Sequence, residues 1–403
     1  MKILIVHNRY RHPGGEDRAV EAEGALLAGR GHEVERWEEN NDSIIGPFAA
    51  GRTALRSVYS FQSAQEMKDR IQRFRPDLVH IHNFFPRLSP AIHIACRRAG
   101  VPVVQTLHNF RLLCPAATFH FEGSLCEGCL GTAIPWRAVV RSCYRESRLA
   151  SLAAAHMVAA HHAFGTWDRS VSQFIALSQF AREKFIAGGI SPDKITVKPN
   201  FVDPDPGMGG GNGDFALFVG RLAEEKGVRT LLTAWGCSRN GPKLKIVGDG
   251  PLASDVAQAA ATNPGIEWLG PCDRERVRRA MAEAKVLIVP STWYEGFPLV
   301  IVEAFAAGLP ILASRLGAMA EFIADGQTGR LFAPGDAAGL AGAVEWAFSH
   351  SDEMRRMRAL ARSQYDQKYT AKANYTRLML IYEAALGRLM EAVHSIPRLE
   401  AIG

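Results

Sequence analysis

Two glutamates, Glu295 and Glu303, lie eight positions apart in the segment PSTWYEGFPLVIVEAFAAGLPILAS, residues 290–314. Glu295 occupies a Tyr-Glu-Gly turn, whereas Glu303 stands in an otherwise apolar run. Taking a carboxylate out of water is costly unless a partner compensates it, so the apolar run predicts a buried Glu303 that binds something. Capping and solvation would explain Glu295 but not Glu303.

The residues between the two glutamates predict a short helix. Pro298 stands near its start, Gly308 at its C-cap and Pro310 just beyond. Backbone N–H groups of the stretch from Gly296 to Leu299 would then be free to bind an anion. One carboxylate could receive sugar hydroxyls and the other ribose hydroxyls, while the helix start holds phosphate.

Two cations, Arg221 and Lys226, lie five residues apart in VGRLAEEKGV, where a predicted strand passes into a helix. Together they could grip a diphosphate from two directions. The alternative is two solvated surface charges, which is the usual state of Lys and Arg.

A glycine turn, Gly14-Gly15, follows the first predicted strand and leads into a helical pattern. Backbone N–H groups and the helix dipole at such a turn suit a phosphate, although an ordinary glycine-rich connection would look the same. Two further strands end in the same tripeptide, His-Asn-Phe, so His82 and His108 are expected at the ligand-binding edge. His80 and His82 alternate on one face, but no third metal ligand is spaced to join them. We expect a satisfied hydrogen bond for His80, and contact with a reacting substrate for His108.

A rival motif is Gly248-x-Gly250-x-x-Ala253 in KLKIVGDGPLAS, which fits a dinucleotide-binding fingerprint. Glu267 is the acid at the expected distance of about 20 residues. However, Glu267 opens the next predicted strand instead of closing it, which puts it at the wrong end of the sheet for a ribose. We therefore favour a nucleotide diphosphate over NAD.

The elements that position these residues alternate between strand and helix on both sides of one Pro- and Gly-rich linker, which predicts two doubly wound α/β domains facing across a cleft. In the linker, the pair Asp203-x-Asp205 is interpreted as turn residues, not as a metal site. Strands are expected in the first half at 2–6, 77–82, 101–108 and 173–178, and in the second at 215–220, 243–248, 266–270, 286–291 and 310–314. The predicted boundaries are 1–198 for the N-terminal domain with a cysteine-containing insert at 111–150, 199–213 for the linker, 214–370 for the C-terminal domain and 371–403 for a C-terminal helix that packs back on the first domain.

Composition limits the class of protein. The chain has 403 residues, 47% of them hydrophobic and 22% charged, with a net charge of +6. These values are ordinary for a globular protein, and no run of about 18 apolar residues predicts a membrane span. The apolar start is too short for a signal peptide, and seven cysteines without one indicate a reducing cytosol. The positive charge favours anionic partners such as phosphates, membrane surfaces or nucleic acid.

Four cysteines in the insert, Cys114, Cys126, Cys129 and Cys143, include one Cys-x-x-Cys pair. The set is compatible with a structural zinc site, with buried free thiols as the alternative.

Arginines recur just after these cysteines at 137, 141, 145 and 148, a spacing that predicts one basic helical face. Residues 52–75 are also basic, with six Lys or Arg against two Asp or Glu. An anionic membrane surface would explain both segments, and solvated helix faces are the alternative. Nucleic acid is not favoured, because no recognised binding motif accompanies the charge.

With these motifs in hand, the chain resembles the retaining GT-B glycosyltransferases of family 4, group 1. The resemblance runs over nearly the full length and includes the Gly14-Gly15 turn, LHNF, KPNFVD, VGRLAEEKG, VGDGP and the Glu-x7-Glu element EGFPLVIVE, which is the most specific. It implies a nucleotide-diphosphate sugar as donor, bound mainly by the C-terminal domain. It also implies a glycan or polyprenyl-diphosphate-linked acceptor and a role in surface polysaccharide biosynthesis. The implied donor-binding residues are Gly14, Gly15, Arg221, Lys226, Gly248, Glu295, Gly296, Phe297, Pro298, Leu299 and Glu303.

By this resemblance Arg221 and Lys226 neutralise the leaving diphosphate, Glu303 binds ribose, Glu295 contacts the transferred sugar and His108 orients that sugar. The leaving phosphate accepts the acceptor's proton, so no metal is expected to be essential. The expected location is cytoplasmic, peripheral to the inner face of the cell membrane. Two rivals stay open: another GT-B nucleotide-sugar enzyme such as an epimerase, and a non-catalytic nucleotide-sugar or lipid-surface binding module.

Overall fold

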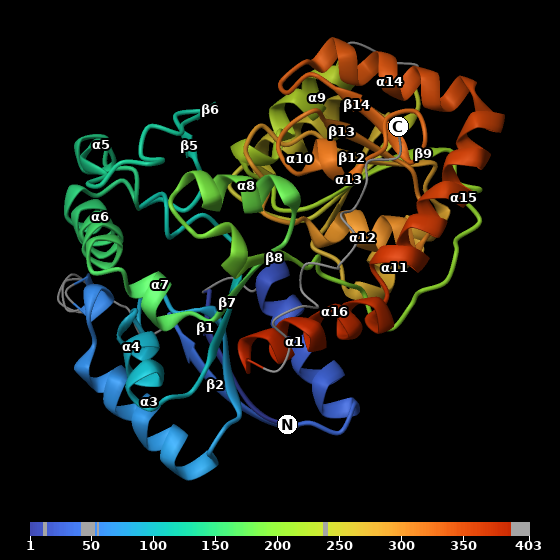
Figure 1. The fold of residues 1–403 in the computed structure, drawn as a ribbon. Coiled ribbons are helices and arrows are strands. Elements are labelled where there is room, and N and C mark those ends of the chain that lie inside the picture. The colour runs from blue at the N-terminus through green and yellow to red at the C-terminus, as the bar shows by residue number, and fades with distance from the viewer. Residues whose placement is uncertain (11–13, 42–52, 55, 237–240, 388–403) are drawn as a thin grey trace. The chain divides into compact units, whose positions relative to one another are not determined.

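The computed structural model divides into two units, each built around one parallel six-stranded sheet (Figure 1). It describes residues 1–10, 14–41, 53–54, 56–236 and 241–387. The first unit consists mainly of residues up to 199 together with those from 374 onward, and the second mainly of residues 200–373.

The first sheet has the strand order β2-β1-β3-β4-β7-β8. Its central strands are apolar and almost fully buried, as expected for a sheet covered on both faces by helices. The strands are β1 Lys2–Arg9, β2 Glu33–Asn40, β3 Leu78–Asn83, β4 Val103–Leu107, β7 Gln173–Ala176 and β8 Ile195–Val197.

The helices of the first unit are α1 Gly15–Gly29, α3 Phe61–Phe74, α4 Ala91–Arg98, α5 Trp136–Val140, α6 Arg148–Ala163, α7 Thr166–Ser170, α8 Gln179–Ala187 and α16 Ala371–Ala385, with a 3-10 turn at Pro192–Lys194. Between β4 and α5 lie two-residue strands, β5 His120–Phe121 and β6 Ser124–Leu125. Leu378, Ile381 and Tyr382 of α16 join a core formed with β1 and α1. α16 therefore packs on the first sheet, as predicted for the C-terminal helix.

The second sheet has the order β11-β10-β9-β12-β13-β14. Its strands are β9 Phe215–Val219, β10 Lys243–Val247, β11 Ile266–Gly270, β12 Val286–Val289, β13 Ile311–Ser314 and β14 Gly329–Phe332. Its helices are α9 Val228–Gly236, α10 Ala253–Thr262, α11 Arg274–Glu283, α12 Leu299–Ala306, α13 Met319–Phe322, α14 Ala337–Ser349 and α15 Ser351–Lys368, with a 3-10 turn at Glu224–Lys226. The two sheets confirm the prediction of two doubly wound domains.

Each sheet reverses its strand order at one point. In the first unit the reversal lies between β1 and β3, and in the second it lies between β9 and β12. Loops at the carboxyl ends of such strands diverge and leave a crevice where ligands bind in open parallel sheets. The functional residues should therefore follow these four strands.

Three strands at the edges of the sheets, β2, β8 and β14, were not predicted. In the polar strand β2 only one of the eight side chains is buried, so no apolar run marks it. The C-terminal helix expected over 371–403 is α16, which is separated from α15 at Tyr369–Thr370; residues 388–403 lie outside the described part. The linker packs closely on the second unit, because a Cβ on Gly209 would lie 2.4 Å from Ala282 Cα. Asp205 pairs there with Arg362, consistent with a structural role and not a metal site.

Among the described helices, none combines the length and the apolar character that crossing a bilayer requires.

Candidate active site

Glu295 and Lys226 form an ion pair at the point where the second sheet reverses its strand order. Glu295 follows β12 and is 6% exposed, and Lys226 follows β9. Lys226 Nζ donates to both carboxylate oxygens at 2.7 and 2.9 Å, and Ser291 Oγ donates to Oε1 at 2.7 Å. The ammonium also lies 5.4 Å from the centre of the Trp293 ring. The sequence predicted that both residues belong to one site, but not that they contact each other.

The charge state of Glu295 follows from these contacts. Burial alone would raise the pKa of Glu295, but the Lys226 ammonium and the hydrogen bonds from Lys226 and Ser291 outweigh burial and hold the pKa below its ordinary value. Glu295 is therefore ionised at neutral pH. An oriented carboxylate beside a cation can accept hydrogen bonds from hydroxyl groups while the cation faces an anion.

A glycine allows the two loops to approach. Gly227 has φ +71°, and a Cβ there would lie 1.8 Å from the Pro290 carbonyl oxygen. The backbone N–H of Thr292 donates to the Glu225 carbonyl at 3.0 Å, which ties the loop after β12 to the loop after β9. The backbone thus holds Lys226 next to Glu295.

The dinucleotide-like glycines have a packing role. Gly248 has φ +136°, and a Cβ there would lie 1.9 Å from the Gly220 carbonyl oxygen. Glu267 lies near the start of β11 and approaches Lys245 of the neighbouring strand at 3.8 Å. The acid is therefore at the amino end of the sheet, as predicted, where a dinucleotide's ribose would not reach it.

The predicted helix between the glutamates is α12, with Pro298 as its N-cap and Gly308 in a left-handed conformation just after its last turn. Glu303, however, is only half-buried, whereas Glu295 is the deeply buried carboxylate, so the expected order of burial was reversed. Val300 and Glu303 lie three residues apart on the partly exposed face of α12, while the other side chains of this helix are buried. The apolar run in the sequence therefore did not bury every side chain of α12.

The remaining predicted residues of the second unit lie in the loop after β9 and at the start of α12. Arg221 is exposed and forms no ion pair with any described residue. The N–H groups of Gly296, Phe297 and Leu299 donate to no acceptor in the described part of the chain, and Pro298 has no N–H. A cation and N–H groups without an acceptor are the kinds of group that can bind an anion; that they do so here stays a prediction.

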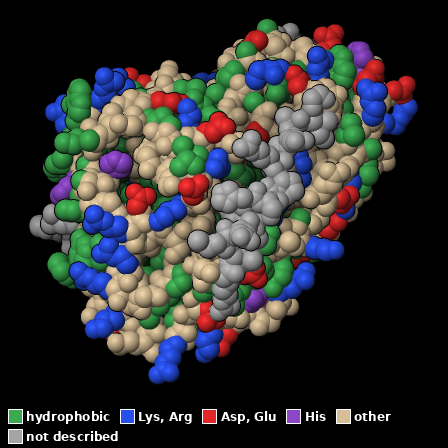
Figure 2. Space-filling model, viewed as in Figure 1, with side chains coloured by type: hydrophobic (Ala, Val, Ile, Leu, Met, Phe, Trp, Pro, Cys, Tyr) green, Lys and Arg blue, Asp and Glu red, His purple; other side chains and the backbone are tan. Residues whose placement is uncertain are grey.

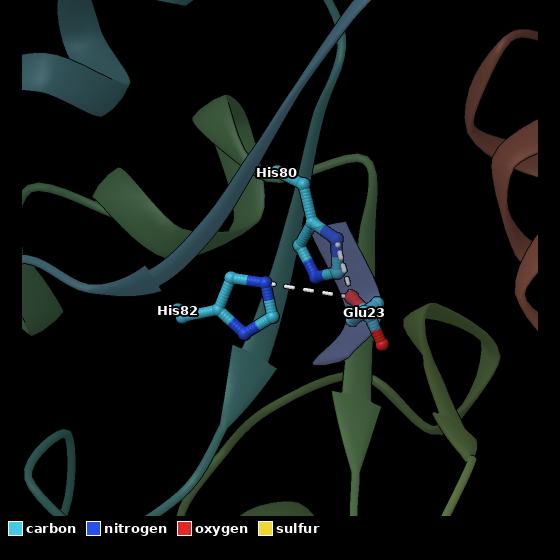
Figure 3. Close-up of side chains that lie close together, drawn as sticks. All are labelled: Glu23, His80 and His82. Carbon is cyan, nitrogen blue, oxygen red and sulfur yellow. Dashed lines mark ion pairs between the residues drawn. The ribbon is translucent and has the colours of Figure 1, made fainter. Parts of the chain in front are cut away.

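In the first unit, His80 and His82 of β3 gather with Glu23 of α1 (Figure 3). Glu23 Oε1 lies 3.1 Å from His80 Nδ1 and 3.4 Å from His82 Nε2. Glu23 Oε2 accepts from Lys198 Nζ at 2.6 Å, and all four side chains are at least 95% buried. Burial raises the pKa of Glu23, but Lys198 and the histidines lower this pKa by more than burial raises it. The pKa of Glu23 therefore lies well below its ordinary value.

His108 is joined to this group through His82. His82 Nδ1 and His108 Nε2 lie 3.0 Å apart, and their rings stack with centres 5.3 Å apart. Desolvation and the nearby charges, His7 foremost, lower the pKa of His108 to about 3, so its imidazole is neutral at physiological pH. His80 has the satisfied hydrogen bonds expected of it, with Tyr382 and Thr106.

The glycine turn is partly occupied by the protein itself. Gly14 is the N-cap of α1, and its N–H donates to Asp17 Oδ2 at 2.8 Å. The Gly15 N–H has no acceptor within the described residues, so Gly15 is the member of the pair whose N–H could meet a phosphate.

Glu23, His80 and His82 also have the spacing of a metal site, since their ligand atoms all lie within 4.8 Å of one another. The sequence had shown no third ligand, because Glu23 comes from α1. Lys198 already neutralises Glu23, and His80 uses both ring nitrogens for Tyr382 and Thr106. The group therefore fits a buried polar network better than a cation site.

Sequence reasoning missed Glu23 and Lys198. A signal for Glu23 was present: Val20, Glu23 and Leu27 are spaced by three and four residues, which puts the acid on the buried face of its helix. No signal of that kind marks Lys198, because only the fold brings it to Glu23, 175 positions away.

The four insert cysteines are free and close enough to influence one another. Burial and the neighbouring thiols, Cys114 first, raise the pKa of Cys129 to about 11. Their sulfur atoms do not meet the 4.8 Å spacing that the Glu23 group shows. Zinc at these cysteines stays a prediction.

Comparison with known proteins identifies the family. Residues 13–206 match the model for Glycosyltransferase Family 4, and residues 214–350 match that for Glycosyl transferases group 1. The chain belongs to glycosyltransferase family 4. This glycosyltransferase is 28% identical over 387 residues to a phosphatidyl-myo-inositol mannosyltransferase of Mycobacterium leprae, covering 92% of this chain and 93% of the relative. It is 26% identical to a glycogen synthase of Mycobacterium tuberculosis, over 93% and 83% of the two chains.

Solved structures agree in fold. HepE of Anabaena in complex with UDP has a TM-score of 0.65 at 19% identity, covering 94% of this glycosyltransferase and 99% of HepE. A sucrose-phosphate synthase of Thermosynechococcus elongatus has a TM-score of 0.70 at 16% identity, over 96% and 100% of the two chains. The fold class is thus GT-B, and the enzyme uses nucleotide-sugar donors.

Proposed function

We propose that this glycosyltransferase moves a sugar, with retention of configuration, from a nucleotide-diphosphate donor to a glycan or polyprenyl-diphosphate-linked acceptor in surface polysaccharide biosynthesis. The observation that supports the donor site most is the Lys226–Glu295 ion pair at the strand-order reversal of the second sheet. In this pair a cation that can bind a phosphate lies next to a carboxylate that can accept hydrogen bonds from hydroxyl groups.

Breaking the anomeric bond creates negative charge on the diphosphate and positive charge on the sugar ring. Lys226 and Arg221 stabilise the diphosphate, together with the N–H groups at the start of α12, and this stabilisation is electrostatic catalysis by groups already in position. Glu295 accepts from hydroxyls of the transferred sugar. Glu303, just over one turn into α12, receives the ribose hydroxyls.

His108 of the first unit is proposed to contact the same sugar, and Gly15 to approach the phosphate through its backbone. The leaving phosphate takes the proton of the acceptor hydroxyl, so the reaction needs neither a protein base nor an essential divalent metal. These roles follow the family resemblance, and the positions of Arg221, Lys226 and Glu295 support them.

Thermal unfolding with UDP, GDP, ADP, dTDP, CMP or NAD tests the donor site. We expect one nucleoside diphosphate to raise the melting temperature by several degrees, equally with and without EDTA, because a ligand at about 100 times its Kd adds about 2.7 kcal/mol. Stabilisation by NAD alone would contradict the proposal. A lower melting temperature with EDTA alone would indicate zinc at the cysteines.

The membrane is the proposed location of the acceptor, and the segment 134–152 offers a surface for it. Five large apolar side chains there are each more than half exposed: Ile134, Trp136, Val140, Leu149 and Leu152. Hydrophobic and basic side chains lie side by side over the region of α5 and α6 (Figure 2). Exposed apolar groups clustered on one face are typical of interaction sites.

The charge of this segment suits anionic lipid. It contains four arginines and one glutamate, and none of the arginines forms an ion pair with a described residue. The prediction that these arginines share one helical face was wrong, because α5 ends at Val140 and α6 begins at Arg148. Residues 52–75 suit lipid less well, since Arg70 and Arg73 already pair with Glu35; residues 52 and 55 lie outside the described part.

Vesicle flotation tests this surface. We expect binding to vesicles containing phosphatidylglycerol, weakened by salt, and little binding to pure phosphatidylcholine. Trp136→Ser with Leu149→Ser should reduce binding by about tenfold or more, because apolar burial anchors such a segment. The matched control is Leu360→Ser on α15, which should bind like the wild type. Equal binding by the double variant, or self-association in place of vesicle binding, would contradict this location.

A further inference from the structure

In the buried polar network of the first unit, a series of side-chain contacts leads from Lys198 to His108. It runs from Lys198 to Glu23, from Glu23 to His82 and from His82 to His108, through the distances of 2.6, 3.4 and 3.0 Å. We propose that Glu23 is a positioning residue which, through His82, keeps the ring proton of His108 on Nε2 and leaves Nδ1 as an acceptor for a sugar hydroxyl. The last step rests on the proposed contact of His108 with the transferred sugar.

The contact between the two imidazoles requires one donor and one acceptor. His82 Nδ1 and His108 Nε2 are at hydrogen-bond distance, and each neutral ring carries a single proton. Burial, more than any neighbouring charge, lowers the pKa of His82 well below its ordinary value, and the pKa of His108 is also lowered. Both rings are neutral, so the only open question is which nitrogen of each carries the proton.

The carboxylate of Glu23 determines which nitrogen of His82 carries the proton. An ionised carboxylate can only accept, and Glu23 Oε1 faces His82 Nε2 at 3.4 Å. Glu23 Oε1 also lies 3.1 Å from His80 Nδ1, but a carboxylate oxygen can accept from both rings. The buried His82 Nε2 has no hydrogen-bond partner within the described residues, so this nearby carboxylate is the group that can attract its proton. The proton of His82 is therefore favoured on Nε2, its Nδ1 accepts from His108 Nε2–H, and His108 Nδ1 keeps its lone pair.

Lys198 keeps Glu23 in the acceptor role. Its ammonium holds Oε2 and thereby prevents protonation that would turn the carboxyl into a donor. The other groups of the cluster have partners of their own: His7 Nε2 contacts Asp17 Oδ1 at 2.9 Å, and His80 contacts Tyr382, Thr106 and Glu23 Oε1. None of them is hydrogen-bonded to His108 in the described part of the chain.

The decisive variant is Glu23→Gln, which keeps the shape of the side chain. Its amide oxygen can still accept from Lys198, while its NH₂ group would donate to His82 Nε2. The tautomers of both histidines would then invert, and His108 Nδ1 would become a donor. The control is Thr106→Val, which removes a hydroxyl from the same cluster but leaves the chain from Glu23 to His108 intact.

Imidazole ¹⁵N NMR of the full chain reads the tautomers directly, with the His108 signals identified by their absence in His108→Gln. We expect His108 to carry its proton on Nε2 in the wild type and in Thr106→Val, and on Nδ1 in Glu23→Gln. A wild-type His108 protonated on Nδ1 would overturn the proposal without any variant, as would an unchanged tautomer in folded Glu23→Gln. A shift of the His80 and His82 nitrogens on adding Zn²⁺ alone would overturn it too, because Glu23 would then hold a metal.

Turnover separates this inference from the proposed function. We expect kcat to fall by about tenfold or more in Glu23→Gln, with the Kd for the nucleoside diphosphate unchanged. If the tautomer inverts and kcat does not change, the assignment of the proton stands and the contact of His108 with the sugar is refuted.

Discussion

Replacement of Glu295 by glutamine is expected to reduce turnover of the nucleotide-sugar donor by about 10²- to 10³-fold, the size of effect seen when one preorganised electrostatic group is lost. Glutamine keeps the side chain's shape but removes the negative charge that, in the proposed mechanism, faces the forming oxocarbenium-like sugar. The neighbouring cation stays, so the Kd for the nucleoside diphosphate should remain within about threefold of the wild type. Initial rates and calorimetric titration measure the two quantities separately.

The matched control is Glu224→Gln. Glu224 lies in the adjoining loop, is exposed and pairs with Arg229 at 2.8 Å. This variant should retain wild-type turnover. Wild-type turnover in Glu295→Gln as well would remove Glu295 from the mechanism.

Replacement of Lys226 by methionine is expected to weaken binding of the nucleoside diphosphate by at least about tenfold, because a charge-assisted contact to phosphate is lost. It also leaves the Glu295 carboxylate buried without its cation, so the pKa of Glu295 should rise above its value in the wild type. Loss of one partner of a buried ion pair destabilises a protein, so the melting temperature should fall too.

A double variant distinguishes the two effects. Lys226→Met with Glu295→Gln contains no unpaired buried charge, so it should be more stable than Lys226→Met alone, yet turn over the donor no faster than Glu295→Gln. Arg229→Met provides the control, since Arg229 is an exposed cation only three residues from Lys226. If Lys226→Met bound the diphosphate with wild-type affinity, the leaving-group assignment would be wrong.

The sequence was informative where one local rule determines the structure. Alternating apolar strands and helices predicted both sheets, and Pro298 with Gly308 predicted the bounds of α12. The edge strand β2 was not predicted, because edge strands need not be apolar on either face.

Contacts between residues that lie far apart in the sequence could not be predicted from the sequence. The sequence named Lys226 and Glu295 separately, but their ion pair depends on the approach of two loops at Gly227, which only the folded backbone shows. Glu23 and Lys198 are an extreme case, since neither stands in a motif and the fold alone joins them. Burial of Glu303 was overestimated because an apolar run of eight residues still has one partly exposed helical face.

In the proposed reaction this glycosyltransferase cleaves a nucleotide-sugar at the anomeric carbon and retains its configuration. Time-resolved ¹H NMR of donor turnover in EDTA, with water or an offered acceptor taking the sugar, tests it most directly. We predict release of the nucleoside diphosphate together with a first-formed sugar product that has the anomeric configuration of the donor. Product of inverted configuration, or no turnover of any donor that binds and stabilises the protein, would contradict the claim.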